Sequence, residues 1–156
     1  MTEQELKSKL DAAERNPEEL ARAVVGLPDH LLRRKPAPDK WSIIEIMAHL
    51  ADIEMVYGYR LRQMIADNEP VIAPIDQDAW ASKLGYMDHS APELIAAYAL
   101  TRRMNMRLLR RISVADLEKG AFHPEMGRKL TVAELVDRMA AHGRSHLEQI
   151  EKLKKM

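Results

Sequence analysis

The segment EPVIAPIDQDAWASKLGYMDH, residues 69–89, decides how this chain folds. It joins two predicted helices and is too long to be a tight turn between them. A short connection makes consecutive helices antiparallel, whereas a long crossover lets them run in the same direction. The topology therefore depends on which helices this segment joins and on the side chains that those helices bring together.

Four helices are predicted, because four positions carry a Ser or Thr followed three residues later by Glu. In this pattern the hydroxyl accepts from the backbone N–H of the glutamate, and the glutamate side chain accepts from the backbone N–H of the Ser or Thr. The pairs are Thr2 with Glu5, Ser42 with Glu45, Ser90 with Glu93, and Thr131 with Glu134. The predicted helices span residues 3–25, 43–68, 91–112 and 132–154. We expect a break in the first at Asn16–Pro17, and a second long connection at residues 113–130.

Composition limits the class of protein. The 156 residues contain 24 Lys and Arg, 24 Asp and Glu, and no cysteine. Zero net charge argues against nucleic acid or acidic lipid as a partner, and the chain has no disulfide or thiolate ligand. No run approaches the roughly 18 apolar residues of a membrane span, and residues 1–10 do not resemble a signal peptide. We expect one cytoplasmic, all-α domain over residues 1–156, with no nucleic-acid or membrane partner.

Three histidines lie on or beside the apolar faces of the second and fourth helices. His142 and His146 are four residues apart and share one helix face, while His49 flanks the apolar stripe of the second helix. Such a pair supplies two imidazole ligands to a transition metal, and a third imidazole leaves coordination positions open. We predict that His49, His142 and His146 bind one divalent metal ion.

The axial levels of these histidines predict the topology. At 1.5 Å per residue, His49 lies about 10 Å from the start of its helix. His142 and His146 lie about 16–22 Å from the start of theirs but about 12–18 Å from its end. The three are closest to one level if the second and fourth helices are antiparallel. We therefore predict an up-down-down-up four-helix bundle, with residues 69–89 as the long crossover between helices two and three.

The histidine pair of the predicted fourth helix and the glycine between the two histidines can each be explained without a metal ion. A lone H-x-x-x-H pattern also fits two hydrogen-bonded boundary histidines. Gly143, between them, costs roughly 1 kcal/mol relative to alanine inside a helix. It either leaves room for a ligand beside the rings or allows another helix to pack closely.

The segments KWSIIEIMAHLADIE (residues 40–54), DQDAW (76–80) and KLTVAELVDRMAAHGRSHLEQI (129–150) resemble the DinB/YfiT-like superfamily of candidate metalloenzymes. The likeness covers most of the chain from about residue 16. Its motifs W-S-x-x-E-x-x-x-H-L-x-x-x-E and H-x-x-x-H-x-x-Q put the family's metal ligands at His49, His142 and His146. The resemblance implies an up-down-down-up bundle, frequent homodimers, and zinc, nickel or iron. Characterised relatives are isomerases and S-transferases that use the small thiols mycothiol or bacillithiol.

Several polar residues on the predicted helices need an explanation. Glu54 lies in the apolar stripe of the second helix, and Arg102 is the expected partner, either fixing helix register or serving catalysis. Glu45 caps its helix and is a candidate hydrogen-bond acceptor for the second ring nitrogen of His49. Asn105 either lines a cavity or is a hydrogen-bonded core amide.

Residues of the connections and of the outer helix faces are assigned simpler roles. Trp80, in the crossover, either walls the pocket or packs in the core. His30, His89 and His123 are expected at the surface. So is a basic stripe on the third helix, formed by Arg103, Arg107, Arg110 and Arg111.

The functional prediction is thiol transfer or thiol-assisted isomerisation of a small molecule. The carboxylates near His49 are poorly placed as general bases, whereas metal coordination deprotonates a thiol cosubstrate without one. Metal-dependent hydrolysis, a non-catalytic metal-binding or stress role, and a helical interaction module are the alternatives. No catalytic residue is assigned.

Overall fold

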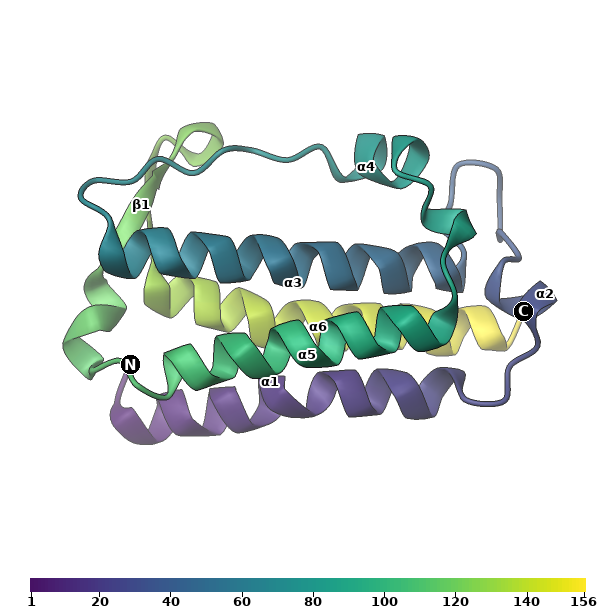
Figure 1. Cartoon of the computed structure of the whole chain (residues 1–156), viewed down its shortest axis with the longest axis horizontal. Helices are drawn as coiled ribbons and strands as arrows, with labels where there is room; N and C mark the ends of the chain where they lie inside the picture. Colours follow the sequence, from purple (N-terminus) through teal and green to yellow (C-terminus); the bar gives the residue numbers. More distant parts are fainter.

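The computed structural model describes all 156 residues and is built on four long helices. They are α1 (Glu3–Val24), α3 (Ile43–Ala66), α5 (Ala91–Leu109) and α6 (Val132–Lys154). α1 and α6 run in one direction and α3 and α5 in the other (Figure 1). α1 and α3 each pack against both α5 and α6. The predicted up-down-down-up topology, with the second and fourth long helices antiparallel, is confirmed.

The predicted helix starts coincide with the observed ones. Thr2, Ser42 and Thr131 each form a reciprocal capping box with the glutamate three residues later. Ser90 also caps α5, because its hydroxyl accepts a hydrogen bond from the backbone N–H of Glu93. The Glu93 carboxylate accepts from the Ser90 hydroxyl and not from the Ser90 backbone N–H, so the box is not reciprocal. The capping pattern therefore predicted all four N-termini. None of the helices combines the length and the hydrophobicity of a membrane span.

The crossover between α3 and α5 runs back along the length of the bundle, over α3 (Figure 1). It contains a short helix, α4 (Gln77–Lys83), and a 3₁₀ turn, η1 (Tyr86–Asp88). The buried Tyr86 donates its hydroxyl to Asp52 of α3 over 2.7 Å. This contact ties the crossover to the bundle. A one-turn helix, α2 (Asp29–Leu32), lies between α1 and α3.

The connection before α6 is more regular than an all-helical chain predicts. It holds two 3₁₀ turns, η2 (Val114–Glu118) and η3 (Pro124–Met126), and a hairpin of strands β1 (Gly120–His123) and β2 (Arg128–Thr131). The strands pair antiparallel, with Gly120 opposite Thr131. The expectation that His123 lies at the surface is wrong, because β1 turns it inward and leaves it 7% exposed. His30 and His89 are exposed, as predicted.

The predicted break at Asn16–Pro17 is also wrong, because α1 continues through Pro17. Proline has no N–H, so the carbonyl of Ala13, four residues earlier, has no partner within the helix. Arg102 of α5 donates to that carbonyl over 2.7 Å and to the side-chain oxygen of Asn16 over 3.2 Å. A neighbouring helix thus supplies the hydrogen bond that proline removes.

Arg102 pairs with Glu54 as predicted. The guanidinium and carboxylate lie 2.7 Å apart, and both side chains are almost fully buried. Asn105 donates to the Glu54 carboxylate over 2.8 Å and to its backbone carbonyl over 3.0 Å. Tyr98 accepts a further bond from Arg102. Tyr98 belongs to one of the two apolar clusters of the core, whereas Glu54, Arg102 and Asn105 belong to neither and form a polar layer.

Candidate metal centre

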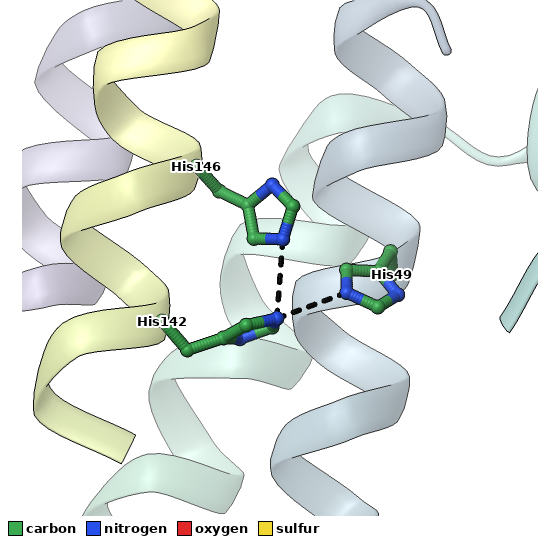
Figure 2. A group of neighbouring side chains, drawn as sticks. All are labelled: His49, His142 and His146. Atoms are coloured by element: carbon green, nitrogen blue, oxygen red, sulfur yellow. Dashed lines mark hydrogen bonds between the residues drawn. The ribbon is translucent and has the colours of Figure 1, made fainter. Parts of the chain in front are cut away.

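Three imidazoles converge between α3 and α6 (Figure 2). Nε2 of His142 lies 3.0 Å from Nε2 of His49 and 3.1 Å from Nε2 of His146. One nitrogen from each of the three rings falls within a group no wider than 4.8 Å. The ring centroids are 4.5–5.0 Å apart. The structure therefore brings together the three histidines that the sequence singled out.

Helix geometry explains why these side chains meet. His142 and His146 are one turn apart on α6, so both project from the same face. His49 projects from α3 at a matching level because α3 and α6 are antiparallel (Figures 1 and 2). His49 is buried, and the other two are half-buried. The cluster is therefore partly accessible to solvent at His142 and His146.

Burial keeps the three imidazoles neutral at pH 7. It lowers the pKa of His49 to about 4, and the charge of His146 contributes. Burial, the two neighbouring imidazoles and Arg102 lower the pKa of His142 to about 3. Burial also lowers the pKa of His146, although its hydrogen bond with Gln149 opposes the shift. Neutral imidazole is the form that binds a metal ion.

The donor set fits a divalent transition metal. A single proton on Nε2 of His142 can serve only one of its two neighbours, so the ring nitrogens do not satisfy one another by hydrogen bonding. Four ligands at Zn–N bonds of about 2.0–2.1 Å stand about 3.3 Å apart in a tetrahedron. The two separations from His142, 3.0 and 3.1 Å, are close to this value, within a cluster that spans 4.8 Å. Three protein ligands would leave a coordination position open.

Two hydrogen-bonding positions around the rings differ in their occupancy. Nδ1 of His146 lies 2.9 Å from the side-chain oxygen of Gln149, which fixes the ring so that Nε2 faces the cluster. Nδ1 of His49 has no partner. The hydrogen bond expected between His49 and Glu45 is absent, because Glu45 binds Ser42 and forms an ion pair with Lys35.

Aromatic side chains cover the cluster on two sides. The Trp41 ring lies 4.8 Å from that of His49 and 6.4 Å from that of His146, centroid to centroid. Tyr57 stands edge-on to His142 at 5.9 Å. Trp80 packs against the apolar cluster near the start of α3 and does not line the cavity beside His146. Trp41, which directly precedes the N-cap residue of α3, lines this cavity in the place suggested for Trp80.

Gly143 and Asn105 serve packing instead of a ligand cavity. A Cβ atom at Gly143 would lie 2.5 Å from the side-chain oxygen of Asn16, so this glycine lets α1 pack closely on α6. The same arrangement recurs at Gly58 of α3, where a Cβ would lie 2.4 Å from the side-chain oxygen of Asn105. Of the two explanations open for each residue, close packing holds for Gly143 and a hydrogen-bonded core amide for Asn105.

A cavity of about 330 Å³ opens beside the cluster. Its walls come from α6, from α4 of the crossover and from the connection before α3. They are Asp39, Lys40, Trp41, Gln77, Asp78, His146 and Gln149. Asp39 is paired with Lys40, whereas Asp78 is exposed and makes no ion pair. Sequence reasoning gave Asp78 no role, although it lies in the DQDAW segment.

A larger cavity, of about 730 Å³, lies at the opposite end of the bundle, between the end of α3 and the hairpin. None of the three histidines lines it. The smaller cavity is therefore the one that the imidazole chemistry can reach.

Comparison with known proteins gives a consistent result. Residues 12–150 match the family model of the DinB superfamily. A protein of Oceanobacillus iheyensis named "putative metal-dependent hydrolase" is 31% identical over 137 residues, covering 88% of this chain and 78% of that protein. A Bacillus cereus protein with the same name is 29% identical and covers 99% and 88%. YfiT from Bacillus subtilis, described as "a probable metal-dependent hydrolase with an unusual four-helix bundle topology", superposes with a TM-score of 0.94. That match covers 99% of this chain and 89% of YfiT at 21% identity.

Proposed function

This chain belongs to the DinB superfamily, and on that basis we propose that it is a metal-dependent hydrolase of a small molecule. The observation that carries the proposal is the convergence of three neutral imidazole nitrogens from α3 and α6. The names of the relatives support hydrolysis ahead of the thiol transfer that the sequence favoured. His49, His142 and His146 would hold the ion.

Zinc or nickel is the expected metal, with iron as a further candidate, because imidazole ligands suit all three. A bound divalent ion acts as a Lewis acid and lowers the pKa of water towards 7. Three neutral ligands leave the ion's charge undiminished at the site. Gln149 holds the ring of His146 in its orientation, and Trp41 limits the access of bulk water from its side.

We assign Asp78 as the general base. Hydrolysis needs a group that removes a proton from water. The carboxylates of α3 nearest to His49 are engaged elsewhere: Glu45 with Ser42 and Lys35, Asp52 with Tyr86, and Glu54 with Arg102. Asp78 is free of such partners and shares the cavity wall with His146. Its side chain is exposed, so it can exchange the proton with solvent.

The test is hydrolysis of an ester and amide panel by metal-loaded protein, with the His49→Ala variant as the blank. Asp78→Asn is expected to lower kcat by about 10²–10⁴-fold, the usual contribution of a positioned base. Asp39→Asn is the matched control, because Asp39 lines the same cavity but is paired with Lys40. Equal activity of the two variants would remove Asp78 from the mechanism. Metal binding without turnover on any substrate would favour a non-catalytic role.

Thiol-dependent transfer is the second candidate. The observation that favours it is the engagement of all three α3 carboxylates, because a thiol that coordinates the metal needs no protein base. This chain has no cysteine, so the thiol would be a separate small molecule. Adding low-molecular-weight thiols and electrophiles to the metal-loaded protein separates the two functions. If the protein turns over electrophiles only when thiol is added, and does not hydrolyse the esters and amides, thiol transfer is the function and hydrolysis is not.

A further inference from the structure

Two arginines lie along the α3–α6 seam, on one side of the histidine cluster. Arg138 is four residues before His142 on α6, which is about 6 Å along the axis. On α3, Tyr57 stands edge-on to His142 at 5.9 Å, and Arg60 is three residues further along. Because α3 and α6 are antiparallel, these steps lead in the same direction away from the histidines (Figure 1).

Arg60 is a buried cation without a carboxylate. It is 8% exposed, and its side chain donates one hydrogen bond, to the backbone carbonyl of Ala73 over 3.0 Å. The other buried arginine, Arg102, forms an ion pair with Glu54. Charged groups are rarely buried unless they are paired. Arg60 therefore departs from the pattern that the rest of this chain follows.

The second cation of this seam, Arg138, is also unpaired. Arg138 is exposed and forms no ion pair, and its contact is with the sulfur of Met126 over 3.3 Å. Burial lowers the pKa of Arg60, and the nearby charge of Arg138 lowers it further, while Tyr57 and Glu125 act in the opposite direction. Glu125, on the hairpin turn, is exposed and bonded to neither arginine. Arg60 and Arg138 therefore lie on the same side of the histidines, and neither forms an ion pair with a carboxylate.

We propose that Arg60 and Arg138 bind an anionic group of the substrate, a carboxylate or a phosphate, whose scissile bond lies at the three histidines. Guanidinium groups bind both oxyanions through paired hydrogen bonds. Arg138 precedes His142 by about 6 Å along α6, so one small molecule could span the proposed anion site and the histidines. This substrate class rests on the proposed hydrolase function, and the binding measurement below is independent of turnover.

The kinetic test compares two esters with the same leaving group on the metal-loaded protein: neutral 4-nitrophenyl acetate and the anionic mono-4-nitrophenyl glutarate. The anionic ester is expected to have the higher kcat/KM. Arg138→Met should lower kcat/KM for the anionic ester by at least 10-fold and for the neutral ester by less than 2-fold. Arg138 is exposed, so this variant is expected to fold, whereas Arg60→Met additionally tests the buried position. Arg103→Met, at an exposed position on α5, is the matched control.

The binding test uses titration calorimetry with glutarate and with inorganic phosphate. Wild-type protein freed of metal with chelator should bind one of these anions, and Arg103→Met should bind it alike, because that variant keeps both arginines of the proposed site. Arg60→Met/Arg138→Met should bind it at least 10-fold more weakly. Preference for phosphate over glutarate would identify a phosphorylated substrate.

The outcomes separate the two proposals. Hydrolysis of both esters at similar rates by wild type and by both arginine variants overturns the anion site and leaves the hydrolase intact. If neither ester reacts, the hydrolase proposal loses its support, and the calorimetry decides the anion site alone. Equal anion binding by the double variant and wild type overturns it.

Discussion

Replacing Arg102 by methionine is expected to destabilise the bundle strongly. The guanidinium is paired at 2.7 Å with Glu54, and the two side chains are 2% and 1% exposed. Removing one member of a buried pair leaves an uncompensated charge, at a cost of about 3–5 kcal/mol. A domain of this size has a free energy of unfolding of roughly 5–15 kcal/mol. The variant is therefore expected to lose a large part of its stability.

A second substitution, at Pro17, separates the lost ion pair from the lost hydrogen bond to the Ala13 carbonyl. Arg102 also donates to the Ala13 carbonyl, which has no partner in α1 because Pro17 lacks an N–H. Arg102→Met leaves that carbonyl unsatisfied, at about 1–3 kcal/mol. Pro17→Ala then supplies the missing N–H. Pro17→Ala should therefore be more stabilising in the Arg102→Met protein than in wild type, by about 1 kcal/mol or more. The steric effect of the proline ring is present in both backgrounds and cancels.

The assay is urea unfolding followed by far-ultraviolet circular dichroism, on the four proteins of this cycle at one protein concentration with chelator present. The dependence of the free energy on urea should be the same for all four. Arg103→Met, the exposed neighbour, should change the free energy of unfolding by no more than about 0.5 kcal/mol. Equal effects of Pro17→Ala in both backgrounds would refute the account of the Ala13 carbonyl.

Three further results are expected. His49→Ala should abolish retention of about one metal ion per chain, measured by mass spectrometry after dialysis, and His30→Ala should not; equal metal content would end the assignment. The metal-free protein should lose stability as pH falls from 7 to 4, because the folded pKa values of His49 and His142, about 4 and about 3, lie below the ordinary 6.5. The unfolded chain then binds more protons, and His49 alone accounts for on the order of 3 kcal/mol; a flat pH profile in chemical denaturation would contradict this. Gly143→Ala should destabilise by about 1–3 kcal/mol although alanine has the higher helix propensity, because the new methyl displaces Asn16. In thermal melts, Asn16→Ala should cost less in the Gly143→Ala protein than in wild type, because the clash is then removed.

Much of the fold was predictable because local chemistry specifies it. The Thr131–Glu134 and Ser42–Glu45 pairs mark helix starts by their own hydrogen bonds, and histidine spacing with crossover length was enough to orient the helices. The predicted break at Pro17 was wrong because the hydrogen bond that proline removes is replaced by one from Arg102 of α5, far away in sequence. The hairpin was missed because its strands are four residues long and lack a sustained alternating pattern.

The candidate site was predictable only in part, because some of its residues come together through contacts between distant parts of the sequence. The three histidines follow from helical periodicity, which is local. The cavity walls do not, because only the path of the crossover brings Asp78 to the cavity beside His146. The unpaired state of Arg60 was also beyond the sequence, since it depends on which carboxylates fail to reach it.

The position of the histidines along the chain gives a bound ion a second effect. His49 and His142 are 93 residues apart in sequence. An ion held by both closes a loop of that length, as a disulfide would. Such a covalent link across about 100 residues removes roughly 4–5 kcal/mol of chain entropy from the unfolded state, which sets an upper limit for the ion. The unfolded chain retains only the local pair on α6 as a chelate, so the ion should bind it far more weakly. Metal binding would then add to the free energy of unfolding of the bundle, apart from any chemistry that the ion supplies.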